Sequence, residues 1–213
     1  MSTGLLEFFP IVKGSSMYPE WFKRLSKGET NVKLCAGLTD MYTNSIVIPS
    51  WQDFEITVHP NGCVDADVVN PNVGISQHEI QTQAYGAWPN HVNVKLISPW
   101  IFTSNEDTLW TMIQPVWAQQ SPSDFVLIPG MLEFKYQNQT NINLLFPILP
   151  ETKTYKINAG DPVAMFIPSS ERKIDLELKY IDDRDIKKLM NNRWIFAKGP
   201  IYSRLRSMAR KNK

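Results

Sequence analysis

Cysteine is scarce in this chain, and long apolar runs are missing from it. The two cysteines, Cys35 and Cys63, match no metal-ligand spacing and are too few to form a disulfide framework in a chain of 213 residues. We expect both to be reduced thiols in the core, because free cysteine is usually buried. No run reaches the roughly 18 apolar residues that a membrane-spanning helix needs. The first residues also lack a secretory signal pattern, so we expect a protein that is neither secreted nor in a membrane.

Acidic residues are almost absent from the last thirty positions. Residues 184–213 hold ten of the 22 Lys and Arg residues but one of the 21 acids, Asp185, which gives them a net charge of +9. The preceding 183 residues carry −8. A tail this basic attracts polyanions, so its basic residues are expected to contact nucleic acid or an acidic protein surface; the alternative is a docked amphipathic tail with a solvated basic face. The candidate contact residues are Arg204, Arg206, Arg210 and Lys211.

The composition that is present favours β structure. Hydrophobic residues make up 43% and charged residues 20% of the chain, as in a folded domain with a core. Fifteen prolines, seven tryptophans and ten phenylalanines favour strands, turns and aromatic packing over a helix bundle. We therefore predict an all-β protein with a helical, basic C-terminal extension.

Apolar and polar residues alternate in several short stretches, as they do in strands with one buried face. Residues 32–69 are typical of β structure throughout and include a hairpin whose Asn61-Gly62 turn favours positive φ angles. A last alternating run is expected to end the domain. The predicted strands are Ser45–Pro49, Phe54–Val58, Val64–Val68, Val92–Leu96, Thr108–Gln114, Asn141–Pro147 and Ile174–Tyr180.

These patterns divide the chain into three segments. They are an N-terminal arm over residues 1–30, a β domain over residues 31–181 and the helical basic extension over residues 182–213. The arm carries an apolar patch that Pro10 interrupts. It can pack on a neighbouring chain, close one end of the β domain as a short helix, or join the local core, which is the usual fate of apolar clusters.

Metal ligands are few. His78, His91 and Glu79 could form a site, but the spacings typical of zinc sites are absent. Asp65 and Asp67 share one face of a predicted strand, yet a hard cation takes about six oxygen ligands. We predict no metal site, and we expect these side chains and His59 at turns and on solvated faces.

The stretch from Phe125 to Pro168 carries the most specific pattern. It contains Ile128-Pro129-Gly130-Met131-Leu132-Glu133-Phe134-Lys135-Tyr136, then a strand, then Ile157-Asn158-Ala159-Gly160-Asp161-Pro162-Val163-Ala164. These runs resemble the P-G-V-I-D-x-D-Y segment and the I-x-x-G-D-R-I-A-Q-L run of the trimeric dUTPase and dCTP deaminase family. The resemblance implies a distorted jelly-roll (dUTPase-like) barrel or sandwich and a homotrimer.

The same resemblance suggests candidate site residues. Glu133 stands where the family has the Asp that orients and deprotonates water, a role that another carboxylate can fill. Tyr136, which would pack against the sugar, is kept. Lys135 replaces the second acid, Pro162 replaces the basic residue after Gly-Asp, and the glycine-rich C-terminal arm is missing. The resemblance therefore gives Glu133 as candidate catalytic residue, Lys135 and Tyr136 as candidate ligand-binding residues, and a divalent cation only if the protein is an enzyme.

Other runs resemble an uncharacterised family of phage and bacterial proteins of about this size. Its runs read C-P, I-P-x-W-x-D, N-P-W-x-I-x-T-P, G-x-V-D-T-D and G-x-P-x-A-Q-x-I-P-x-R-E. The chain departs from them at Ala36, Ser98, Glu133 and Lys135. The resemblance implies a phage origin and supplies no mechanism. The matching runs here are Leu34-Cys35-Ala36, Ile48-Pro49-Ser50-Trp51-Gln52-Asp53, Ser98-Pro99-Trp100-Ile101-Phe102-Thr103, Pro129-Gly130-Met131-Leu132-Glu133, and Gly160-Asp161-Pro162-Val163-Ala164 with Ile167-Pro168 and Glu171-Arg172.

Three functions agree with these observations. We favour a non-catalytic dUTPase-like barrel that acts as a binding or assembly module, because the scaffold pattern persists while the phosphate-handling parts do not. The second is a divergent nucleotide pyrophosphatase or deaminase with Glu133 as general base. The third is a structural component of a virus particle. We expect a homo-oligomer such as a trimer, in the host cytoplasm or in a virus particle, with other phage proteins or nucleic acid as further partners.

Overall fold

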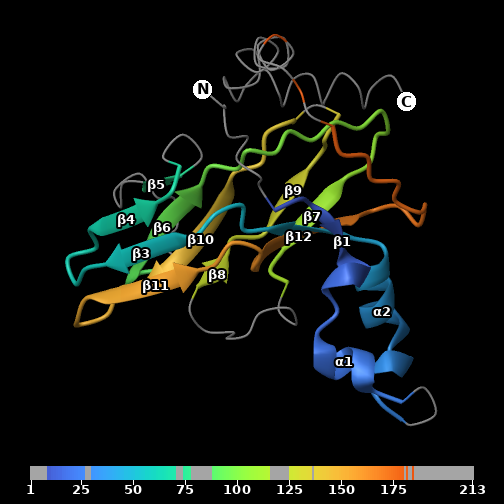
Figure 1. The fold of residues 1–213 in the computed structure, drawn as a ribbon, viewed down its shortest axis with the longest axis horizontal. Helices are drawn as coiled ribbons and strands as arrows, with labels where there is room; N and C mark the ends of the chain where they lie inside the picture. Colours follow the sequence, from blue (N-terminus) through green and yellow to red (C-terminus); the bar gives the residue numbers. More distant parts are fainter. Residues whose placement is uncertain are drawn as a thin grey trace, which may run out of the picture.

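The computed structural model describes residues 9–26, 30–70, 74–77, 88–115, 125–135, 137–179, 181 and 184. The regular structure within these residues consists mainly of twelve strands, which pair in three antiparallel sheets, and the few helices are short (Figure 1). The β class predicted from the composition is confirmed.

The largest sheet has five strands in the order β1, β2, β12, β7 and β9. Their bounds are β1 Val12–Lys13, β2 Ile46–Pro49, β7 Trp110–Ile113, β9 Gly130–Leu132 and β12 Pro162–Pro168. β12 lies in the middle, where Met165 is opposite Val47 of β2 on one side and Ile113 of β7 on the other. Strands from both halves of the chain are thus joined through β12.

The other two sheets are smaller. A four-stranded sheet has the order β5, β6, β10 and β8, and a three-stranded sheet has the order β11, β3 and β4. The longest pairing joins β6 to β10 over six residues of each strand. The bounds are β3 Phe54–Val58, β4 Val64–Val68, β5 Ile75–Gln77, β6 His91–Leu96, β8 Val126–Leu127, β10 Ile142–Pro147 and β11 Lys153–Ile157.

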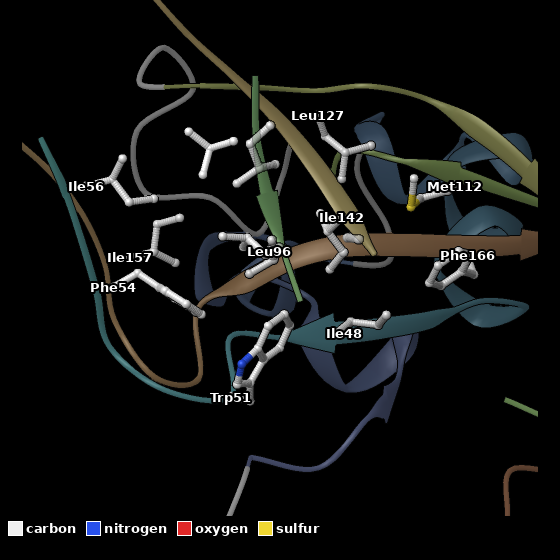
Figure 2. Close-up of a cluster of buried hydrophobic side chains, with 14 of the residues drawn as sticks. Ile48, Trp51, Phe54, Ile56, Leu96, Met112, Leu127, Ile142, Ile157 and Phe166 are labelled. Atoms are coloured by element: carbon white, nitrogen blue, oxygen red, sulfur yellow. The ribbon is translucent and has the colours of Figure 1, made fainter. Parts of the chain in front are cut away.

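All three sheets contribute side chains to one hydrophobic core. Figure 2 shows Phe54, Ile56 and Ile157 of the three-stranded sheet facing Leu96 and Ile142 of the four-stranded sheet. The predicted alternation holds best in β3, where every second residue is fully buried and the intervening ones are more exposed. This burial is the main source of stability, because each large apolar side chain removed from water contributes roughly 1.5–3 kcal/mol.

Short helices cover the opposite face of the five-stranded sheet. They are η1 Gly14–Met17, α1 Glu20–Arg24, η2 Val32–Leu34 and α2 Ala36–Thr43. Tyr42 of α2 is fully buried against Val47 and Met165, which forms a second, smaller core (Figure 1). The prediction of β structure from residue 32 onward is therefore wrong over residues 32–43, because packing of Tyr42 on the sheet stabilises a helix there.

The part of the predicted N-terminal arm that is described packs on its own chain. Phe22 of α1 is buried and stacks on Tyr18 with ring centroids 4.5 Å apart. This agrees with the short-helix and local-core interpretations for residues 12–24. Residues 1–8 of the arm lie outside the described residues.

The predicted hairpin joins β3 to β4. The amide of Gly62 donates to the carbonyl of His59 and the amide of His59 donates to the carbonyl of Cys63, at 2.9 and 3.0 Å. Gly62 has a φ of 79°, as in a three-residue loop closed by a left-handed glycine. The hairpin is confirmed, with a positive φ at Gly62 and none at Asn61.

Two further expectations are wrong. No strand is assigned to residues 173–179, so the last predicted strand, Ile174–Tyr180, has no ladder among the described residues. Cys35 and Cys63 are exposed rather than buried, because Cys35 begins α2 and Cys63 follows the hairpin turn, both at the surface.

The C-terminal extension is not covered by the description beyond Arg184. Its helices and its basic residues Arg204, Arg206, Arg210 and Lys211 lie outside the described residues, so they stay predictions. Within the described part of the chain, no helix has the length and apolar character to cross a membrane.

Leu144 in β10 tests the shared core. It is fully buried, so we expect Leu144→Ala to lower the free energy of unfolding by about 2–5 kcal/mol. Leu34→Ala is the matched control, because Leu34 is 64% exposed and should change stability by about 0.5 kcal/mol or less. Urea denaturation followed by circular dichroism measures both; equal losses would contradict the assigned core.

Gly62 tests the turn. A side chain at its φ of 79° is strained, so we expect Gly62→Ala to destabilise the protein by about 1–2 kcal/mol. In contrast, a Cβ at Gly37 of α2 would meet no atom within 4 Å, and Gly37→Ala should stabilise by up to about 1 kcal/mol. Thermal unfolding of the two variants should therefore shift in opposite directions.

Candidate functional site

A groove lies at the end of the five-stranded sheet, beyond the last residue of β12. Its walls are the loop of residues 100–110 and the segment of residues 168–181, and its volume is about 690 Å³. A smaller hollow of about 420 Å³ adjoins it and shares Glu106, Thr108 and Arg172. Pockets of this size accept small ligands or several side chains of a partner.

Aromatic rings form the floor of the groove. Phe102 stacks on Phe134 with centroids 4.5 Å apart and an interplanar angle of 14°. Trp110 packs on the same Phe134 ring at 5.2 Å, and Phe166 of β12 packs edge-on at 5.4 Å. Because these rings interlock with the core, the floor is rigidly held.

Several of the charged side chains around the groove form ion pairs. Arg172 Nη1 lies 3.0 Å from Glu106 Oε1, and Lys135 Nζ lies 2.7 Å from Asp107 Oδ1. Lys179 likewise pairs with Glu177 at 3.0 Å. Among the described residues, three acidic and three basic side chains line the groove, so their charges balance and neither sign is concentrated there.

Two hydrogen-bond donors at the groove lack acceptors. The indole N–H groups of Trp100 and Trp110 are buried and have no hydrogen-bond partner among the described residues. A buried polar group without a partner is costly and often marks the place of a ligand or water. A ligand with oxygen acceptors could therefore form hydrogen bonds with these two indole groups.

One wall of the groove is an extended segment without a strand partner. Ile174 and Leu176 pack partly buried against the core, whereas Leu178 is 48% and Ile181 38% exposed. Among the described residues, no backbone hydrogen bond is made by residues 173–179. Their sequence alternates like a strand, so the wall presents both apolar side chains and backbone groups that could pair with a neighbour.

Only some of the residues predicted from the dUTPase resemblance lie beside this groove. Glu133 follows β9, is half-buried, and its carbonyl accepts a hydrogen bond from Gln137 N at 2.8 Å. Lys135 reaches the rim through its ion pair with Asp107. Tyr136 lies outside the described residues. Pro162 begins β12 and is not among the residues that line the groove.

The two described histidines, His59 and His91, do not line the groove. His59 Nε2 lies 2.8 Å from Asp65 Oδ2 and its Nδ1 lies 3.2 Å from Thr152 Oγ1, on the exposed side of the three-stranded sheet. His91 packs against Trp88, and His78 lies outside the described residues. In the ranges that the structure describes, no group of three or more His, Cys, Asp or Glu residues could hold a metal ion.

Charged residues also cross the outer face of the three-stranded sheet. Glu55 of β3 lies opposite Asp67 of β4, and Lys156 of β11 pairs with Glu55 from the other side. The hydrogen bond and charge of Glu55 raise the pKa of Lys156. Lys156 therefore offsets the repulsion between the two opposed carboxylates, which is a structural role.

Sequence reasoning missed the groove itself. Trp100 and Trp110 are partly buried against the core. The spacing of the sequence could not predict their contact with residues 170–181, because about 60–80 positions separate the two walls. The one available signal was the alternating run from Ile174 onward, which predicts a strand and therefore a strand partner.

Comparison with known proteins adds no relative. No family model matches the chain, and no curated protein is significantly similar to it. The groove and the segments around it are thus the features that bear on function.

A double-mutant cycle tests whether the rim charges are only structural. Lys135 and Asp107 are more than a third exposed, so we expect a coupling free energy of about 0.2–1 kcal/mol between Lys135→Met and Asp107→Asn. The coupling should fall as salt rises. The pair Arg172 and Glu106 serves as a more exposed control; a salt-insensitive coupling above about 2 kcal/mol would point to a buried site instead.

Proposed function

We propose that this protein is a non-catalytic binding or assembly module with a dUTPase-like jelly-roll barrel, encoded by a phage. It acts as a homo-oligomer such as a trimer, in the host cytoplasm or in the virus particle. Other phage proteins, or nucleic acid held by the basic tail, are its further partners.

The observation that carries this proposal is the composition of the groove. Its floor is aromatic, its acidic and basic side chains balance, and one wall is an extended segment with no backbone hydrogen bond among the described residues. A hydrolase of phosphate esters needs positive groups or a metal aimed at the phosphates. A groove with an aromatic floor and available backbone groups instead suits a segment of a protein chain.

The stretch that resembles a catalytic motif also supports a scaffold role. Phe134 lies between the candidate residues Glu133 and Lys135 and anchors the floor through its contacts with Phe102 and Trp110. Lys135 is engaged by Asp107. We therefore expect the turn from Glu133 to Lys135 to have a structural role, because it holds the aromatic floor in place. Buried aromatic clusters contribute strongly to packing.

Nucleotide turnover tests the proposal. We expect no hydrolysis or deamination above the blank when the protein is incubated with dUTP, dCTP and their ribonucleotide counterparts in the presence of Mg²⁺, measured by chromatography of the products. Glu133→Gln is the matched variant, and it should be indistinguishable from the unaltered protein. Turnover that Glu133→Gln abolishes would overturn the proposal and support the alternative hydrolase with Glu133 as general base.

A further inference from the structure

We infer that copies of this chain associate head to tail, with the short N-terminal helices of one copy on the β3–β4 hairpin of the next. Two surfaces form this contact, a basic patch on the helices and an acidic patch on the hairpin. The basic patch consists of Trp21, Arg24, Lys33 and Leu34, and the acidic patch consists of Glu55, Asp65, Asp67 and Val69. This rests on the proposed function, because it names the surfaces that join the proposed homo-oligomer.

The basic patch combines positive charge with exposed apolar side chains. Trp21 and Arg24 are three positions apart in α1, so they lie on one face of that helix. Lys33 Nζ donates to two carbonyls at the end of α1, at 2.7 and 3.1 Å, which holds η2 and its Leu34 beside α1. Trp21 is 50% and Leu34 64% exposed, and residues 12–43 carry a net charge of +2. This surface therefore suits an acidic partner with some apolar character.

The acidic patch has the complementary composition. Residues 53–69 contain four acidic residues and neither Lys nor Arg. Glu55 and Asp65 are engaged by side chains of their own sheet, whereas Asp67 is exposed and forms no ion pair with a described residue. Val69, directly after β4, is 70% exposed. The hairpin thus offers negative charge beside an exposed apolar side chain.

The two patches cannot meet within one copy. Figure 1 shows α1 and β4 at opposite ends of the molecule, and every residue of both patches lies in the described part of the chain. The folded body separates them, so a contact between the patches joins different copies.

This kind of contact agrees with the proposed trimer. A patch that pairs with its own copy closes a two-fold dimer, whereas a ring of three copies needs two different, complementary patches on each copy. Opposite charges on the two patches attract the copies and orient them. Burial of Trp21, Leu34 and Val69 then removes apolar surface from water on both sides of the contact.

Charge reversal tests the contact. We expect Arg24→Glu and Asp67→Lys each to weaken association about tenfold or more, because each change places like charges opposite one another. A chain that carries both changes should regain the association of the unaltered protein, since the facing charges are again of opposite sign. Glu171→Lys is the matched control, because Glu171 is exposed and belongs to neither patch, and it should leave association unchanged. Light scattering over a concentration series measures association, and circular dichroism confirms that each variant is folded.

The mass of the oligomer separates failure of this inference from failure of the proposed function. An oligomer that neither single change weakens overturns the head-to-tail contact alone, and so does a double variant that associates as poorly as the single ones. A strictly monomeric unaltered protein overturns both the contact and the proposed homo-oligomer. Association of the unaltered protein should also weaken as salt rises, because the charges at this contact start from exposed positions.

Discussion

Burial of β12 on both of its faces is the constraint on which the rest of the structure depends. Val163, Ala164, Met165 and Phe166 are all fully buried. Phe166 points into the core that the three sheets share, and Met165 points into the smaller core under α2. A strand with two apolar faces must be covered on both sides, and this requirement places the four-stranded and three-stranded sheets on one side and the helices on the other.

The groove follows from the same constraint. Where β12 ends at Pro168, the chain leaves the sheet and continues as an extended segment, held to the body by the Arg172–Glu106 ion pair and by its apolar side chains. The loop of residues 100–110 faces it because Phe102 and Trp110 are fixed on Phe134 and thereby on the core. The site is therefore a rigid aromatic floor with a loosely bonded wall, an arrangement suited to receiving a strand.

Sequence reasoning identified residues that lie near the site but did not predict the contacts that they make. Glu133 and Lys135 were chosen for their place in a motif, and the structure pairs Lys135 with Asp107 beside the groove and puts Phe134, between them, under the floor rings Phe102 and Trp110. The partner of Lys135 is Asp107, 28 positions away, and such a pairing depends on how β7 and β9 align. Cys63 was expected inside because of residue type alone, whereas its place beside a tight turn keeps it exposed.

By itself the sequence determined the β class, six of the twelve strands and the Gly62 turn, because alternation and turn chemistry are local and act on neighbours along the chain. It did not determine the helix over residues 36–43, which Tyr42 stabilises through contacts with β2 and β12. Nor did it determine the unpaired segment of residues 173–179, since a strand forms only where a second strand is in reach. Which residues meet across the groove was decided by tertiary structure, because the packing of three sheets on one core, rather than spacing, sets those distances.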